Sequence, residues 1–307
     1  MRFLVLGILL LAPAASSQEV RFLQSTHGQA WVVAFGPDGR LLVSGNSDGT
    51  ASIWDLETGA VRSDLGGHEG TVPAVAIDPE GRFVVTGGWD CRVRVWEAAT
   101  GRPVRDLAGV PENDHVLAIA LRPGGRVVAA GLINGEVLLW PIEGGEPRVL
   151  TGHSGKVAGI AFSPDGRLLA SGSMDQSVRI RDVDSGEERS RLDHASYVQA
   201  VAWSPDGSTI AAADWDFVRL WDARSGAAGR AIRGHDFQID GLAWSLDGRR
   251  LATASYDGKV RVWDPASDAP PLVLETGDQS PHSVAFSPDG ARLAAACHDG
   301  IRIWSLR

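Results

Sequence analysis

The chain has 307 residues, and its composition of 44% hydrophobic and 22% charged residues is that of a soluble globular protein. Its net charge is −9, from 38 acidic against 29 basic residues without a basic run, which argues against nucleic-acid phosphates or an anionic membrane surface as partners. The 37 glycines imply many tight turns, so the composition predicts short strands joined by turns and an all-β architecture.

The first 17 residues, MRFLVLGILLLAPAASS, differ from the rest of the chain. A run of nine mainly apolar residues follows Arg2, and small residues follow the run. Nine residues are too few to span a membrane, which takes about 20, so the pattern predicts a signal peptide over residues 1–17, cleaved near 14–17. We expect the mature chain, residues 18–307, to be exported to the periplasm or out of the cell, without membrane insertion after cleavage. A buried N-terminal strand or an uncleaved anchor would change this compartment.

The remainder of the chain is one unit repeated in seven copies. The copies are FGPDGRLLVSGNSDGTASIWD (35–55), IDPEGRFVVTGGWDCRVRVWE (77–97), LRPGGRVVAAGLINGEVLLWP (121–141), FSPDGRLLASGSMDQSVRIRD (162–182), WSPDGSTIAAADWDFVRLWD (203–222), WSLDGRRLATASYDGKVRVWD (244–264) and FSPDGARLAAACHDGIRIWS (286–305). The final strand of each copy carries a tryptophan, or Arg181 in the fourth, at spacings of 40 to 44 residues. A fixed period of this size indicates a repeat architecture that fills the mature chain.

Turn residues divide each unit into short strands. Proline presets φ and glycine supplies a positive φ in turns such as Pro164–Gly166, and Asp257–Gly258 is typical of a tight hairpin. Valine, isoleucine and leucine fill the segments between the turns, and a further strand such as VRSDL (61–65) separates consecutive units. The pattern therefore predicts four strands per unit.

These motifs together resemble the WD-repeat family over residues 20–307. The resemblance rests on Gly67-His68, Gly152-His153 and Gly234-His235, on the Ser-Pro-Asp-Gly turns, and on Trp54-Asp55, Trp221-Asp222 and Trp263-Asp264. It implies a single seven-bladed β-propeller of four-stranded blades. The pattern departs from the family at Arg181, and at Glu112 and Gly277, which occupy histidine positions.

The strand order also predicts how the ring closes. The first strand, residues 20–24, has no blade of its own, and the last strand, residues 301–305, lacks an outer neighbour. Pairing the two removes an open sheet edge that would invite aggregation.

The resemblance implies that several polar residues have a structural role within the blades, which we call the frame, and do not form a functional site. Matched to the family's hydrogen-bonded sets, the complete sets are His68, Thr86, Asp90 and Trp96, and His235, Thr253, Asp257 and Trp263. Blade one is nearly complete with His27, Ser44, Asp48 and Trp54, and blade four keeps His153, Ser171 and Asp175 but has Arg181. Burial of such groups is tolerated because each satisfies another.

Motifs that suggest catalysis or cofactor binding do not fit this frame. The GNSDG segment, residues 45–49, lies in a hairpin and not in the strand-turn-helix of a nucleophilic serine. Cys91 and Cys297 fall in non-adjacent blades, so we expect free thiols. His282 and His298, with Asp299 nearby, are the one group that could bind a metal, although histidines on a rim are more often hydrogen-bonding contacts. We expect no catalytic residue, cofactor or metal.

A second set of large side chains has no place in the frame. In the family, the residue before the turn aspartate and two positions at the start of the innermost strand surround the mouth of the central channel. These positions hold Trp31, Trp89, His115, Leu117, Ile133, Met174, Tyr197, Trp215, Tyr256, His282 and His298. Exposed aromatic clusters mark interaction surfaces, which predicts a non-catalytic monomeric scaffold that binds an unidentified protein or peptide.

Two alternatives remain open for this rim. The large side chains could pack on one another and plug the channel mouth. The rim could instead bind a small molecule or glycan, with hydrolase or lyase activity, if His115, His282 and Asp240 supply an acid or base beside a stacked sugar.

Overall fold

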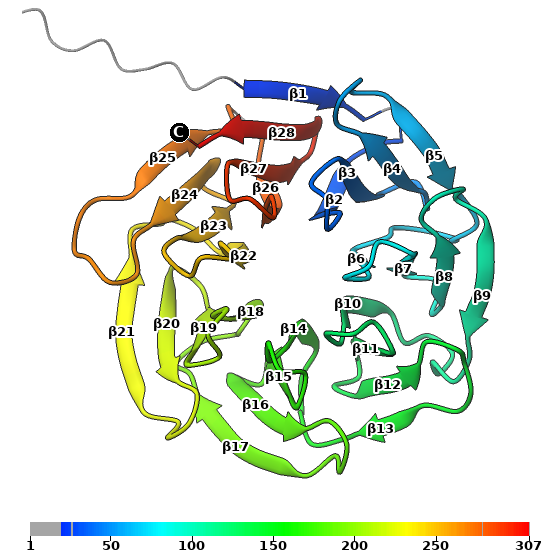
Figure 1. Ribbon diagram of the computed structural model, residues 1–307. Helices are drawn as coiled ribbons and strands as arrows, with labels where there is room; N and C mark the ends of the chain where they lie inside the picture. Colours follow the sequence, from blue (N-terminus) through cyan, green and yellow to red (C-terminus); the bar gives the residue numbers. More distant parts are fainter. Residues whose placement is uncertain (1–19, 26, 278, 307) are drawn as a thin grey trace, which may run out of the picture.

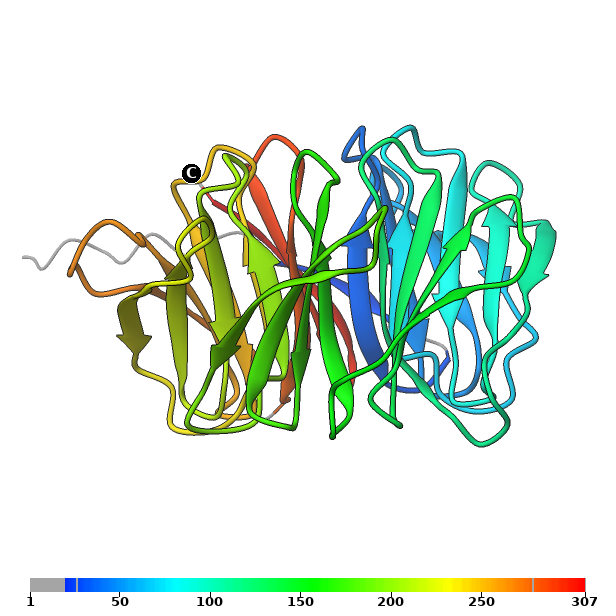
Figure 2. The same ribbon diagram turned by 90° about the horizontal axis from the view of Figure 1, so that it is seen from below.

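The computed structural model describes residues 20–25, 27–277 and 279–306. The predicted signal peptide, residues 1–17, lies outside this range. Within it, no helix is long and apolar enough to cross a membrane. The strands form seven four-stranded sheets arranged as blades around a central channel (Figure 1), which confirms the predicted seven-bladed propeller. Figure 2 shows the hairpin turns on the two faces of the disc.

Each blade runs from an innermost strand at the channel to an outer strand at the outer edge of the disc (Figure 1). Blade one contains β2 (Ala30–Phe35), β3 (Leu41–Asn46), β4 (Ala51–Asp55) and β5 (Val61–Leu65). Blade two contains β6 (Ala74–Ile77), β7 (Phe83–Gly87), β8 (Val93–Glu97) and β9 (Pro103–Leu107). Blade three contains β10 (Val116–Leu121), β11 (Val127–Leu132), β12 (Val137–Pro141) and β13 (Arg148–Leu150). All neighbouring strands within these sheets are antiparallel.

The other four blades repeat this order. Blade four contains β14 (Val157–Phe162), β15 (Leu168–Ser173), β16 (Ser177–Asp182) and β17 (Glu188–Asp193). Blade five contains β18 (Ala200–Trp203), β19 (Thr209–Ala213), β20 (Phe217–Asp222) and β21 (Ala228–Arg233). Blade six contains β22 (Ile239–Trp244), β23 (Leu251–Ser255), β24 (Lys259–Trp263) and β25 (Leu272–Glu275). Blade seven contains β26 (Pro281–Phe286), β27 (Arg292–Cys297), β28 (Gly300–Ser305) and β1 (Val20–Gln24).

Blade seven joins the two ends of the described chain. β1 pairs with β28 in antiparallel register, with Val20 opposite Trp304 and Gln24 opposite Gly300 (Figure 1). This pairing confirms the predicted closure. It also makes the last blade dependent on the N-terminal strand, so a long-range pairing secures the ring.

The Ser-Pro-Asp-Gly turns are held by their own side chains. In blade four, Ser163 Oγ donates to Asp165 at 2.6 Å and accepts from the Leu168 amide at 2.9 Å. Gly166 has φ 71°, a conformation that glycine adopts without strain. The hairpin between β14 and β15 is therefore held by contacts within the turn itself.

The apolar core lies between adjacent blades. Trp96 and Val84 of blade two pack in one cluster with Val43 and Ile53 of blade one, and equivalent clusters recur around the ring. A Cβ on Gly87 would lie 2.4 Å from a methyl group of Val116 in blade three, so only glycine allows this approach. Each blade is thus stabilised chiefly by its two neighbours, as in other repeat proteins.

Arginines of the outer strands add polar ties between blades. Arg62 donates to the Ala99 carbonyl at 2.9 Å, Arg148 to that of Val183 at 3.0 Å, and Arg230 to that of Pro265 at 3.2 Å. Each bond runs from one blade to the turn after the third strand of the next. These contacts tie neighbouring blades together at their outer strands, away from the channel.

Candidate binding surface at the channel mouth

The frame beneath the rim is clearest in blade two. His68 Nδ1 lies 2.8 Å from Asp90, His68 Nε2 lies 2.8 Å from Thr86 Oγ1, and Trp96 Nε1 donates to the same hydroxyl at 2.9 Å. The Thr86 hydroxyl thus joins the indole to the imidazole, and the Asp90 carboxylate accepts a hydrogen bond from Nδ1–H of His68. Burial lowers the pKa of His68 despite the hydrogen bond to Asp90, so the ring is held neutral.

Blade six repeats this arrangement. His235 contacts Asp257 at 2.9 Å and Thr253 at 2.6 Å, and Trp263 donates to Thr253 at 2.9 Å. An arginine completes each set, because Arg94 pairs with Asp90 at 2.8 Å and Arg261 with Asp257 at 2.6 Å. Burial opposes ionisation of Asp90, but hydrogen bonds from His68 and Arg94 outweigh it and lower its pKa.

The arginines were missed in the sequence, although their signal was present. Arginine stands two residues before the last marker of five repeats: Arg94, Arg179, Arg219, Arg261 and Arg302. In this position it lies across the strand from the hydrogen-bonded set. Of these five, Arg94 and Arg261 contact the set, whereas Arg179 pairs with Glu188 and Arg302 with Asp299.

Blades one and four depart from the complete set. His27 contacts Asp48 at 3.0 Å, but its Nε2 lies 3.2 Å from Asp64 and makes no hydrogen bond to Ser44 within the described residues. The nearly complete set proposed for blade one is therefore wrong at this link, because the partly exposed ring turns to the outer strand. In blade four, buried Arg181 donates to the Thr151 carbonyl in place of an indole.

Blade five contains a shortened set that the sequence did not reveal. Ala212 lacks the hydroxyl, and Trp221 Nε1 donates directly to His194 Nε2 at 3.0 Å. His194 Nδ1 lies 3.5 Å from Asp214, whose carboxylate oxygens are buried and have no hydrogen-bond partner among the described residues. The hairpin after β19 is one residue shorter than that after β7, which brings Asp214 inward.

Six of the predicted rim residues form a continuous series of ring contacts, which we call the aromatic arc: Trp31, Trp89, His115, Tyr256, His282 and His298. Trp31 stacks on His282 with centroids 4.4 Å apart and lies 6.1 Å from Trp89. The Trp89 ring lies 5.7 Å from His115, and the His282 ring lies 5.3 Å from Tyr256 and 4.8 Å from His298. The arc therefore joins blades three, two, one, seven and six.

The remaining predicted residues lie outside the arc. Leu117 and Met174 line the channel, and Ile133 is partly buried on blade three. Tyr197 and Trp215 are 48% and 49% exposed, and neither ring stacks on another within the described residues. The structure thus groups about half of the predicted rim and leaves the blade-five aromatics apart.

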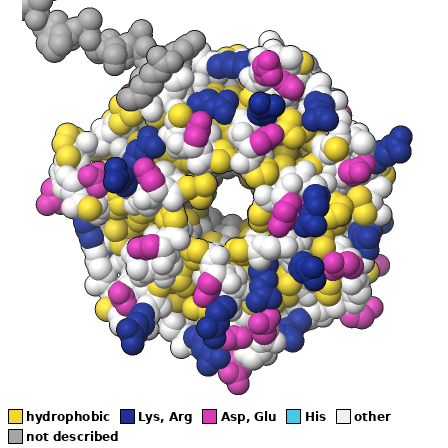
Figure 3. All heavy atoms as spheres, in the orientation of Figure 1, with side chains coloured by type: hydrophobic (Ala, Val, Ile, Leu, Met, Phe, Trp, Pro, Cys, Tyr) yellow, Lys and Arg dark blue, Asp and Glu magenta, His cyan; other side chains and the backbone are white. Residues whose placement is uncertain are grey.

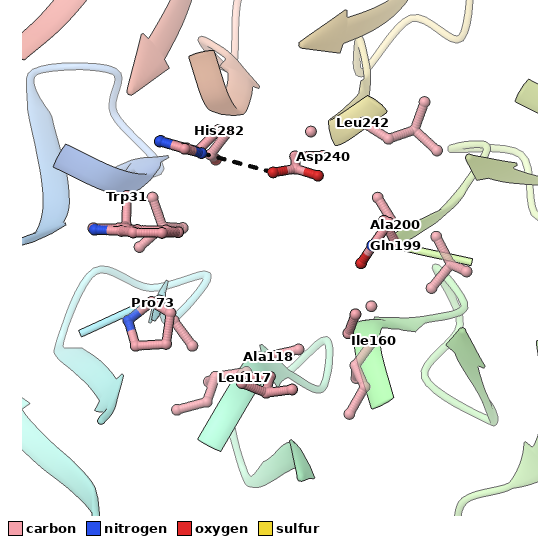
Figure 4. Close-up of a pocket in the computed structure, with 18 of the residues that line it drawn as sticks. Trp31, Pro73, Leu117, Ala118, Ile160, Gln199, Ala200, Asp240, Leu242 and His282 are labelled. Carbon is pink, nitrogen blue, oxygen red and sulfur yellow. Dashed lines mark ion pairs between the residues drawn. The ribbon is translucent and has the colours of Figure 1, made fainter. Parts of the chain in front are cut away.

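A cavity of about 430 Å³ occupies the channel beside the arc. Trp31, His282 and Asp240 form one wall, and apolar side chains such as Leu117 and Ile160 form the opposite wall (Figure 4). Seen from one face, the centre of the ring is an opening bordered by hydrophobic side chains (Figure 3). The arc packs on itself, as a plug would, but it leaves this cavity open.

Asp240 is the carboxylate of this wall. His282 Nδ1 lies 3.6 Å from Asp240, and Gln238 Nε2 donates to Asp240 at 2.6 Å. Burial, together with the charge of Asp240, raises the pKa of Tyr256 to about 12, so its hydroxyl stays protonated. Both ring nitrogens of His282 and the indole nitrogen of Trp31 are buried without a hydrogen bond among the described residues.

The other groups that suggested chemistry are dispersed. Cys91 and Cys297 are free thiols, as expected, and burial raises the pKa of Cys297 to about 11. Asp299 forms two hydrogen bonds with Arg302, at 2.6 and 2.9 Å. Within the described ranges, no group of three or more His, Cys, Asp or Glu side chains could hold a metal ion.

Comparison with known families agrees with this architecture. Residues 29–216 match the family described as IFT122 first beta-propeller, and residues 228–264 and 272–305 match the WD domain, G-beta repeat. The first match spans more than half of the chain. Propellers of these families are generally non-catalytic scaffolds that bind other proteins.

Proposed function

The chain belongs to the WD-repeat β-propellers and, by its longer match, to the family of the IFT122 first beta-propeller, and on this premise we propose that it is a non-catalytic scaffold whose rim binds a protein or peptide. The observation that carries the proposal is the exposure of large aromatic side chains around one channel mouth. Trp89, Tyr197, Trp215 and Tyr256 are 38–49% exposed on a ring of seven mutually supporting blades. Aromatic side chains on a rigid support bind with little loss of conformational entropy.

We propose that the mature protein binds its partner outside the cytoplasm. The N-terminal segment, residues 1–17, has the charge and apolar pattern of a signal peptide, and cleavage there leaves β1 available for ring closure. We place the mature scaffold in the periplasm or the extracellular space, as a monomer. Determination of the N-terminal residue of the protein purified from its native host tests the cleavage.

Affinity capture from the native cell envelope tests the binding role. The bait is the mature chain from Gln18, compared with a Trp89→Ala/Trp215→Ala/Tyr256→Ala variant of matched stability. A partner that the first bait retains and the variant loses supports the proposal. Equal capture by both baits contradicts it and moves the search to the opposite face or the outer strands.

A small molecule or glycan in the channel is the second candidate, because the cavity brings Trp31 beside the His282–Asp240 pair. The pair would have to exchange a proton with the ligand for hydrolase or lyase activity. Both His282 nitrogens are covered, so this wall favours binding over turnover. Turnover of a glycan panel by the wild type, lost in His282→Gln, would support an enzyme instead.

A further inference from the structure

The ring contacts at the channel mouth are confined to one side of it. They run from Trp89 on blade two through Trp31 to His282 on blade seven, where Tyr256 of blade six joins them. Trp215 occupies the repeat position of Trp89 and is more exposed, but it lies outside this series. A ligand that follows continuous aromatic surface therefore lies over the arc and leaves blades four and five uncovered.

A groove of about 620 Å³ extends the arc beyond Trp89, between blades two and three. One wall is the loop around Glu112, which belongs to the longest repeat of the chain and has an acid at the histidine position. The other wall includes Cys91, which has φ 61° where Gly49, Gly135 and Gly258 are equivalent; Gln176 of blade four shares this departure, with φ 66°. Two departures from the repeat, Glu112 and Cys91, thus line the groove beside Trp89.

Negative charge predominates in the groove. Its carboxylates are Glu69, Asp90, Asp106 and Glu112. Arg94 pairs with Asp90 at 2.8 Å, and Arg92, which also lines the groove, pairs with Asp106 at 3.3 Å. Neither Glu69 nor Glu112 forms an ion pair within the described residues, and both are exposed. The groove therefore presents uncompensated carboxylates beside the exposed face of Trp89.

The other end of the arc has a carboxylate and unused hydrogen-bond donors. Asp240 lies in the channel wall, 3.6 Å from His282 (Figure 4). The indole N–H of Trp31 and the imidazole of His282, which is 6% exposed, have no partner among the described residues. A buried donor without a partner is costly, and a peptide carbonyl could satisfy it only if the side chains that cover these nitrogens move aside. Lys156, from the segment before blade four, lines the same cavity as Asp240 and His282.

From these features, and resting on the proposed function, we infer that the partner contributes an extended peptide segment with basic side chains. Lysine or arginine binds near Glu69 and Glu112 in the groove, and another cation lies against the arc near Asp240. The backbone between them follows Trp89 and Trp31. The net charge of −9 adds a long-range attraction for such a segment.

Synthetic peptides test the chemistry without the native partner. The probe is fluorescein-labelled Gly-Lys-Ala-Arg-Ala-Lys-Gly, with a counterpart in which glutamate replaces each basic residue, and binding is followed by fluorescence polarisation. We expect the basic peptide to bind the mature chain more tightly than the acidic one. The Glu69→Gln/Glu112→Gln variant should weaken this binding about fivefold, as the loss of two exposed ion pairs predicts.

Two matched controls separate local recognition from overall charge. Asp193→Asn/Asp216→Asn makes the same change in net charge on blades four and five, at an exposed and a half-buried carboxylate that each pair with an arginine, and should leave binding unchanged within about twofold. Trp89→Ala should weaken binding, whereas Trp215→Ala should not.

Three outcomes would overturn the inference: equal or tighter binding of the acidic peptide, equal weakening by the two double variants, or no binding of either peptide. If capture from the envelope still depends on the rim, the proposed function stands and only the basic chemistry fails. Selective peptide binding without any rim-dependent envelope partner would instead count against the proposed function alone.

Discussion

Blades two and five present the same residue to solvent above different frames. Trp89 and Trp215 both precede the turn aspartate, and they are 40% and 49% exposed. Trp96 and Trp221, seven and six residues further on, are buried at 4% and 8%. In both blades, one tryptophan belongs to the surface and the other to the interior.

The difference lies in the polar groups between these two layers. In blade two, the Thr86 hydroxyl accepts from Trp96 and contacts His68. In blade five, Trp221 donates directly to His194, and the carboxylate of Asp214 is buried without a hydrogen bond among the described residues. Because each blade packs against two neighbouring blades, the ring tolerates an incomplete hydrogen-bonded set in a single blade.

The comparison also shows that exposure alone does not identify a binding residue. Trp89 lies 6.1 Å from Trp31 and next to a groove, whereas Trp215 stands apart from the other rings. Trp31 belongs to the first blade of the chain and His282 to the last. Their stacking depends on closure of the ring, so the arc is a property of the whole propeller.

Replacement of each tryptophan of blade two by alanine should separate the two layers. Trp96→Ala should lower the free energy of unfolding by about 3–5 kcal/mol, because it removes a buried side chain and one of the two hydrogen bonds of the Thr86 hydroxyl. Trp89→Ala should change it by less than about 0.5 kcal/mol, since the ring is exposed. Urea denaturation measures both. A comparable loss in the two variants would make Trp89 part of a packed plug.

Asp90 of blade two and Asp214 of blade five should respond to neutralisation with opposite signs. Asp90→Asn removes a charge that accepts from His68 and Arg94, and should lower the free energy of unfolding by about 2 kcal/mol. Asp214→Asn puts a neutral amide in place of a buried carboxylate that lacks a hydrogen bond among the described residues. This change should raise the free energy of unfolding by about 1 kcal/mol. Denaturation of the two variants at neutral pH is the measurement. Destabilisation by Asp214→Asn would show that its contact with His194 is a stabilising ion pair.

The fold was predictable because its signals are local and repeated. Turns such as Pro164–Gly166 hold each hairpin through their own hydrogen bonds. Seven copies of the repeat in register then predict a propeller of seven blades. Ring closure followed from counting strands, and β1 pairs with β28 as expected. Equivalent positions in a repeat pointed to eleven side chains around the channel mouth, of which six form the ring contacts of the arc.

The details of the frame were less predictable, because they depend on single residues and hairpin lengths. The direct bond from Trp221 to His194 follows from the missing hydroxyl at Ala212 and from a hairpin one residue shorter. His27 contacts Asp64 on the outer strand, a choice that repeat alignment does not contain. Contacts within the arc depend on ring geometry, which brings Trp31 to His282.

A smaller change isolates the hydroxyl that distinguishes blade two from blade five. Thr86→Val keeps the shape of the side chain but leaves Trp96 Nε1 and His68 Nε2 without their shared partner. We expect it to lower the free energy of unfolding by about 1–2 kcal/mol. Thr86→Ser retains the hydroxyl and should cost less than about 1 kcal/mol. Equal losses in both variants would assign the effect to the methyl group and its packing.

The smallest expected effect is a pH dependence of stability. Burial lowers the pKa of His68 below its ordinary value of 6.5, despite the opposing hydrogen bond to Asp90. The unfolded chain therefore takes up a proton that the folded chain resists, and stability falls as pH drops below 6.5. His68→Gln should make this fall shallower, by less than about 1 kcal/mol between about pH 7.5 and 5.5.

His27 provides the control of opposite sign. Burial acts to lower its pKa, but Asp48 and Asp64 outweigh burial and raise it. Its contribution to stability is therefore fully present below 6.5 and is lost as pH rises through the folded pKa. His27→Gln should steepen the acid-side fall that His68→Gln makes shallower. Denaturant midpoints of both variants, measured from about pH 5.5 to 7.5, test this difference. If both substitutions change the pH dependence of stability in the same direction, the opposite pKa shifts of the two histidines are contradicted.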